Sequence, residues 1–360
     1  MAKVTCSTKG TCFRDVIFGG TLYMQELEIT TTWTLSRGLN QDLRAAINNG
    51  LTGVRLILKG KNKSLRTSIY DFYCSVRKVA PNFKIMVDLP GGKPRLGNFI
   101  DSIFIEKGQL LSLSYSNEHY STDAIPTEYL KPYSSFINVG DRVLVNDGCS
   151  TFEILSTYED GITIQLVDDF ATLMPNRSIN LPDSNLSYNA LTDSDIDMLA
   201  QLEGLDINMV AISMVSNASD VVRAKELLLS LNLNAELIAK IETPEALSCL
   251  PEISVEADSM MIARGDLTTL CGEDNLFAAQ VKIIKAGRKY SKSLIGATGL
   301  LASLGSCKKP SISEICDASF LLQCGLSRFL LADGDLCFSF PNRGCAWLKY
   351  LYSNIKILKE

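Results

Sequence analysis

The chain has 360 residues, of which 46% are hydrophobic and 21% charged, so it can bury a large core. Its net charge of −5 at pH 7 argues against nucleic-acid or membrane-surface binding, and no apolar run is long enough for a membrane span or a secretory signal. The 11 cysteines include no CxxC pair, so we expect reduced thiols in a cytoplasmic protein. The single histidine, His119, excludes a multi-histidine zinc site.

The first part of the chain alternates short apolar runs with helical patterns. Strands are predicted at 26–35, 53–60 and 83–92, and helices at 36–50 and 68–80. The segment 97–184 breaks this rhythm with short alternating runs and Gly and Asp turns, as in a small all-β domain inserted after the third strand. We therefore predict barrel residues 1–96, an insert at 97–184, and further barrel residues at 185–360.

The alternation resumes after the insert. Strands are predicted at 207–215, 235–242, 259–265, 293–298 and 327–333. Helices are predicted at 218–232, 275–291 and 311–325. Eight β-α units of this kind are typical of a closed parallel (β/α)8 barrel, whose functional groups lie at the carboxyl ends of the strands.

The predicted strand 235–242 carries two charges where a buried strand is expected. Because alternate residues of a strand share a face, Ile238, Lys240 and Glu242 should point one way, toward the mouth of the barrel. Desolvating such charges is costly, so they need a partner, a metal or a chemical role. An internal Lys–Glu pair that only satisfies itself is the structural alternative.

The next two strands end in polar residues as well. Asp266 follows the strand 259–265, and with Glu242 it supplies hard oxygen ligands suited to Mg²⁺ or Mn²⁺. Gly265 allows a ligand to approach the backbone closely. Thr298 ends the strand 293–298 just before a predicted helix, whose free N–H groups would bind an anion. Together these residues predict a phosphate or carboxylate site.

At these positions the sequence resembles the pyruvate kinase family. The motifs that carry the resemblance are AKIETPEAL (239–247), MMIARGDL (260–267), LIGATGLLASL (294–304), VDLPGGKPRLG (87–97) and VGDRVLVNDG (139–148). It spans nearly the whole barrel and the insert. The resemblance implies a TIM barrel with a β lid, and phosphoryl transfer between phosphoenolpyruvate and ADP, giving pyruvate and ATP, through an enolpyruvate intermediate with Mg²⁺ or Mn²⁺.

The resemblance also implies residue roles. Lys240 would neutralise the transferring phosphoryl group, Thr298 would lie at the proton-transfer face, and Glu242 and Asp266 would hold the metal. Arg55 would act with the catalytic residues, and Arg55 and Arg95 would bind phosphates. The backbone of four consecutive residues would cradle the substrate: Ala263, Arg264, Gly265 and Asp266.

The family's potassium ligands are largely missing. Their positions hold Ile57, Lys59, Asp88 and Leu89, and the glutamate of the same loop is Lys93. We therefore expect no potassium requirement. Our hypothesis is that the ammonium of Lys93 or Lys59 fills the potassium volume and pairs with Asp88.

The nucleotide side departs further from the family. Pro90, Gly60, Gly299 and the ADGD stretch (332–335) replace family residues there, and Arg177 alone remains of the basic cluster in the lid. The family's C-terminal allosteric domain is also expected to be absent. Two alternatives stay open: a Mg²⁺-dependent lyase or aldolase that generates an enolpyruvate, and a non-catalytic pyruvate-kinase-like binding protein. A homo-oligomer is possible.

Overall fold

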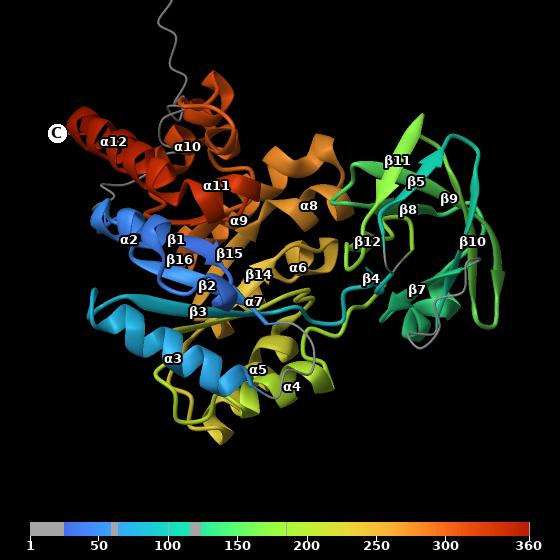
Figure 1. Cartoon of the computed structure of the whole chain (residues 1–360), viewed down its shortest axis with the longest axis horizontal. Helices are drawn as coiled ribbons and strands as arrows, with labels where there is room; N and C mark the ends of the chain where they lie inside the picture. Colours follow the sequence, from blue (N-terminus) through green and yellow to red (C-terminus); the bar gives the residue numbers. More distant parts are fainter. Residues whose placement is uncertain (1–24, 59–63, 100, 116–123, 185, 360) are drawn as a thin grey trace, which may run out of the picture.

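A computed structural model describes residues 25–58, 64–99, 101–115, 124–184 and 186–359. Eight parallel strands close into a barrel in the order β1-β17-β16-β15-β14-β13-β3-β2 (Figure 1). They are β1 (Glu28–Trp33), β2 (Gly53–Ile57), β3 (Lys84–Leu89), β13 (Met209–Ile212), β14 (Glu236–Ile241), β15 (Ser259–Ala263), β16 (Ser293–Ala297) and β17 (Arg328–Leu331). Each lies within one of the predicted strand ranges, so the predicted barrel is confirmed.

The barrel interior is filled by one side-chain set and its outer face by another. Ile238 packs inside with residues from the other strands, such as Met86, Met209 and Met261. Leu237 and its outward-facing neighbours Ala239 and Ile241 pack instead in the layer between the barrel and its helices. The period-2 pattern of 235–242 therefore gave the orientation of β14 correctly.

Helices cover the barrel (Figure 1). Five of them match predicted ranges: α2 (Gln41–Asn48), α3 (Leu65–Arg77), α5 (Ala218–Ser230), α9 (Leu276–Lys289) and α10 (Ile312–Gln323). The others lay outside the predicted ranges: α4 (Asp193–Ala200), α6 (Pro244–Ser248), α7 (Leu250–Glu256), α8 (Arg264–Cys271), α11 (Gly334–Ser339) and α12 (Pro341–Lys359). None of the described helices is both long and apolar enough to cross a membrane.

The amino-terminal end of the barrel is closed by a buried arginine. Arg328 begins β17 and donates from Nη1 and Nη2 to the two carboxylate oxygens of Glu236, at 2.5 and 3.0 Å. Its Nε lies 3.3 Å from Oε2 of Glu28. Because these residues begin three different strands, the ion pairs tie together one end of the barrel and leave the opposite end for ligands.

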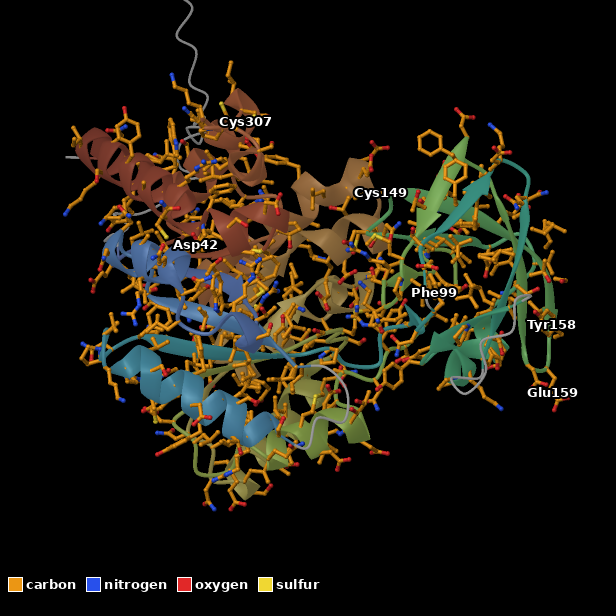
Figure 2. The ribbon with its side chains drawn as sticks, in the orientation of Figure 1. Asp42, Phe99, Cys149, Tyr158, Glu159 and Cys307 are labelled. Atoms are coloured by element: carbon orange, nitrogen blue, oxygen red, sulfur yellow. The ribbon has the colours of Figure 1, made fainter. Side chains whose placement is uncertain are left out.

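A second β unit is inserted after β3. Its larger sheet has the order β12-β8-β9-β10-β6-β7-β4, and β11 pairs with β5. The strands are β4 (Arg95–Leu96), β5 (Ile103–Glu106), β6 (Leu110–Ser114), β7 (Ala124–Glu128), β8 (Arg142–Val145), β9 (Ser150–Tyr158), β10 (Gly161–Leu166), β11 (Phe170–Leu173) and β12 (Ile179–Asn180). Figure 2 shows Phe99 on the side of this insert near the barrel, and Tyr158 and Glu159 at its far edge. The division of the chain at residues 97 and 184 stays a prediction.

The chain enters and leaves the insert side by side. The N–H of Leu96 donates to the carbonyl of Arg177 at 2.8 Å, and the N–H of Ile179 donates to the carbonyl of Pro94 at 2.9 Å. Arg95 and Ser178 form an isolated antiparallel bridge between these hydrogen bonds. The two connections therefore form a paired stem, residues 94–96 and 177–179.

Candidate active site

A cavity of about 400 Å³ lies at the carboxyl ends of the barrel strands, between the barrel and the insert. The predicted site residues that line it from the barrel are Arg55, Asp88, Lys93, Lys240, Glu242, Ala263, Gly265, Asp266 and Thr298. Arg95 and Arg177 line it from the stem of the insert. Residues far apart in the sequence thus meet in one pocket, as the strand-end argument predicted.

Lys240 is buried and surrounded by acceptors. Its Nζ donates to Oγ of Ser213 at 2.7 Å and lies 3.4 Å from Oδ1 of Asp88 and 3.7 Å from Oε2 of Glu242. Burial alone would lower the pKa of Lys240, but the carboxylates of Asp88 and Glu242 outweigh burial and raise it. The side chain is therefore a fixed positive charge facing the cavity.

Glu242 has one satisfied oxygen and one unsatisfied oxygen. Oε1 accepts a hydrogen bond from the N–H of Met214 at 2.7 Å. Oε2 is buried and has no hydrogen-bond partner among the described residues. Burial, partly offset by Lys240, raises the pKa of Glu242 to about 7. A buried carboxylate oxygen in this state is suited to a cation.

Asp266 lies in the first turn of α8, directly after β15. Its Oδ1 accepts from the ammonium of Lys93 and, at 3.3 Å, from Nδ2 of Asn180 in the insert. Burial opposes the charge of Asp266, but the Lys93 ammonium outweighs burial and lowers the pKa of the carboxyl group. Asn180, which sequence reasoning missed, thus links the insert to the barrel site.

The predicted pairing of Lys93 with Asp88 is wrong. Lys93 pairs with Asp266, while Asp88 pairs with Arg55 at 3.1 Å and with Lys240 at 3.4 Å. This pairing is electrostatically reasonable, because Asp88 already pairs with two cations and Lys93 supplies the one ion pair that Asp266 makes among the described residues. The other predicted potassium substitute, Lys59, lies outside the described residues.

The carboxylates fit a divalent cation of the Mg²⁺ type. Glu242 and Asp266 follow the neighbouring strands β14 and β15 and line the same cavity. Within the described parts of the chain, no group of three or more acidic, Cys or His side chains forms a metal-binding cluster. Mg²⁺ commonly takes one or two carboxylates and fills its other positions with water and substrate oxygens. The unsatisfied Oε2 of Glu242 agrees with that arrangement.

The guanidinium groups differ in their surroundings. Arg55 donates to Oγ1 of Thr32 at 2.6 Å and to Asp88 at 3.1 Å, so its head is held in place at the cavity wall. Among the described residues, Arg95 and Arg177 form no ion pair. These two arginines are therefore available to an anionic ligand.

The stretch 263–266 has two faces. Ala263, Gly265 and Asp266 line the cavity. The side chain of Arg264 does not: it donates to the carbonyl of Thr298 at 2.6 Å and to Asp317 at 2.7 Å. The proposed cradling of substrate by this backbone stays a prediction. The Arg264 side chain instead holds the Thr298 carbonyl in place from outside the cavity, a position that the sequence analysis did not predict.

The residues after Thr298 overturn the predicted helix. Thr298, Gly299 and Leu301 have positive φ angles of 62°, 70° and 55°, so residues 298–301 form a turn, and only the 3-10 helix η4 (Ala302–Gly305) follows. The N–H of Gly299 donates to both carboxylate oxygens of Asp333, at 3.1 and 2.9 Å. The chain's own carboxylate thus occupies the place where an anionic ligand was predicted to bind.

Comparisons with known proteins agree with the resemblance. The family profile described as "Pyruvate kinase, barrel domain" matches residues 25–332. The pyruvate kinase of Thermococcus litoralis is 28% identical over 272 residues, 74% of this chain and 57% of the relative. That of Thermotoga maritima is 30% identical over 249 residues, covering 69% of this chain and 53% of the relative. That of Mycobacterium intracellulare is 30% identical over 258 residues, covering 71% and 54%. The chain spans about half the length of these curated relatives.

Proposed function

The chain belongs to the pyruvate kinase family, and from that premise we propose that it catalyses metal-dependent phosphoryl transfer between phosphoenolpyruvate and an acceptor, with ADP as the first acceptor to test. The observation that carries the proposal is the meeting of Lys240, Glu242, Asp266 and Thr298 around one cavity at the carboxyl end of the barrel. Phosphoryl transfer needs alignment and charge neutralisation more than covalent catalysis, and it needs water kept out.

In this proposal the phosphoryl group lies against the positive side of the cavity. Lys240 is fixed by Ser213 and the acidic residues around it, so its ammonium is oriented before the substrate arrives. Preorganised charge of this kind stabilises the transition state without reorganisation. Arg55 adds a second fixed positive charge, and Arg95 approaches from the insert, which serves as the lid.

Glu242 and Asp266 are the residues that would hold a divalent cation. When bound, such an ion supplies positive charge to substrate phosphate and enolate oxygens. The role of the protein is to present the unsatisfied Oε2 of Glu242 and the carboxylate of Asp266 from adjacent strand ends. The Thr298 hydroxyl lines the same cavity and is assigned to the proton-transfer face of the substrate.

The test is a turnover assay with phosphoenolpyruvate, Mg²⁺ or Mn²⁺, and a panel of nucleoside diphosphates. Pyruvate release that depends on both the metal and an acceptor supports the phosphotransferase. Pyruvate release with inorganic phosphate but without a nucleotide is hydrolysis, with water as the acceptor. The lyase alternative is supported instead if the protein forms pyruvate by C–C cleavage of a 4-hydroxy-2-oxo acid and leaves phosphoenolpyruvate intact. Phosphoenolpyruvate binding without turnover under every condition supports a non-catalytic binding protein.

A further inference from the structure

The turn after β16 has the geometry of an anion cradle. Gly299 has a positive φ of 70° and the next residue, Leu300, has a negative φ, and such an alternation turns successive N–H groups toward one point. The carboxylate of Asp333 already occupies this position: both of its oxygens accept from the N–H of Gly299, at 3.1 and 2.9 Å. The backbone of Leu300 also acts to lower the pKa of this carboxyl group.

Asp333 does not cap the helix that it precedes, although it stands at the N-cap position. It is the N-cap residue of α11, where an aspartate normally accepts a hydrogen bond from its own helix. Its side chain makes no such bond and reaches across to the turn after the neighbouring strand β16. The carboxylate is therefore committed to the cradle and not to its own helix.

The cradle faces the cavity that contains Lys240. Thr298, Asp333 and Gly334 all line that cavity, and Arg55 lies on the same wall. Burial, partly offset by the Gly299 N–H and by Arg264, raises the pKa of Asp333. Because both carboxylate oxygens of Asp333 accept from the N–H of Gly299, an incoming anionic group would meet this side chain at the spot where the backbone offers its donors.

We propose that Asp333 is a specificity-determining residue, a built-in carboxylate that fills the anion cradle at Gly299 and so disfavours a phosphate-bearing acceptor at this edge of the cavity. The acceptor that fits this edge presents a neutral or cationic group to Asp333. The assignment of an acceptor rests on the proposed phosphotransferase, whereas occupation of the cradle rests only on the geometry.

The experiment measures anion binding directly, by isothermal titration calorimetry of the full chain with inorganic pyrophosphate in metal-free buffer. Asp333→Ala empties the cradle and should bind pyrophosphate at least tenfold more tightly than the wild type. Asp333→Asn removes the charge but keeps an acceptor oxygen, so its affinity should fall between them. ADP is the second probe and should follow the same order.

Two control variants separate the cradle from general charge effects. Asp335→Asn changes an exposed residue of the same helix, outside the cavity, and should leave affinity within twofold of the wild type. Asp147→Asn removes a negative charge from the same cavity without opening the cradle. Asp147 has a φ of 56°, which asparagine tolerates well.

The proposal is overturned if Asp333→Ala binds pyrophosphate no more tightly than the wild type, or if Asp147→Asn gains as much affinity as Asp333→Ala. Circular dichroism melting checks the fold, and if Asp333→Ala fails to fold, the near-isosteric Asp333→Asn decides by the same comparison with Asp147→Asn. These measurements involve no turnover. A wild type that never consumes phosphoenolpyruvate would therefore refute the proposed function and leave this result standing.

Discussion

Lys93 and Asp266, separated by 173 residues, form a partly buried ion pair at the edge of the candidate active site. Lys93 comes from the loop after β3, and Asp266 comes from the first turn of α8. The ammonium thus occupies one oxygen of a carboxylate that we assign to a divalent cation. A divalent cation and the Lys93 ammonium would therefore compete for the Asp266 carboxylate.

Replacing Lys93 by Met should therefore strengthen metal binding. The variant leaves Asn180 as the remaining side-chain donor to the Asp266 carboxylate among the described residues, so we expect Mn²⁺ to bind about three- to tenfold more tightly without substrate. Free Mn²⁺ measured by electron paramagnetic resonance gives the affinity. Lys107→Met, at an exposed lysine of the insert, is the control and should change nothing. Weaker Mn²⁺ binding in Lys93→Met would show that Lys93 supports the metal site.

Replacing Lys240 by Met should remove turnover. The substitution keeps the length of the side chain and deletes the charge that we place at the transferring phosphoryl group, so the rate should fall about 10³-fold or more. The turnover assay described above measures the loss. Lys225→Met on the outer surface of α5 should retain full activity. A Lys240→Met protein that folds normally and keeps its rate would exclude the proposed role.

Replacing Gly265 by Ala should change stability and substrate binding in opposite directions. Gly265 lies in the first turn of α8, where alanine favours the helix by about 0.5–1 kcal/mol. The added methyl group would lie 3.4 Å from Cγ2 of Thr298, inside the cavity. We expect a higher melting temperature together with a several-fold higher KM for phosphoenolpyruvate. An unchanged KM would mean that the substrate does not lie between Gly265 and Thr298.

Replacing Glu236 by Gln should weaken the base of the barrel in a pH-dependent way. Burial opposes the charge of Glu236, but Arg328 outweighs burial and lowers the pKa of the carboxyl group below its ordinary value. A carboxyl group with a lowered folded-state pKa stabilises the protein above its unfolded pKa, about 4.3, and this stability is lost as pH falls through the folded value. Above about pH 5 the variant should lose about 2 kcal/mol of unfolding free energy, because Arg328 loses a charged partner.

Urea unfolding of the wild type and Glu236→Gln between pH 3 and pH 7 checks this prediction. The difference in unfolding free energy should be constant at the upper end and shrink below about pH 4. Glu226→Gln, at an exposed position on α5, supplies the control for carboxylate loss at the surface. A difference that grows as pH falls would have the wrong sign for an ion pair with Arg328.

The barrel strands were predictable because each is a short apolar run with a clear boundary. The position of Lys240 and Glu242 at the mouth followed from the alternation along β14. Helix α8 was missed because it begins immediately after β15, within a stretch that also looks like a strand end. The turn at Thr298 was mistaken for a helix because its composition is apolar, whereas its left-handed backbone depends on tertiary contacts such as the Gly299–Asp333 hydrogen bonds.

The partners of the charged side chains were less predictable. A sequence shows that Asp88 and Asp266 both lie near the carboxyl ends of strands, but it does not show which cation pairs with which carboxylate. That depends on side-chain reach across the closed barrel, which favoured Arg55 and Lys240 for Asp88 and left Lys93 to Asp266. Asn180 had no motif of its own, and only the docking of the insert brings it within 3.3 Å of Asp266.

The stem that joins the insert to the barrel has a mechanical consequence. Its two segments are hydrogen-bonded to each other, and they carry Arg95 and Arg177. Any swing of the insert about this stem must carry both guanidinium groups together, whereas Arg55 and Lys240 stay anchored in the barrel wall. If the insert moves relative to the barrel, Arg95 and Arg177 therefore move as one unit, and a single opening movement would withdraw both arginines from a bound anion.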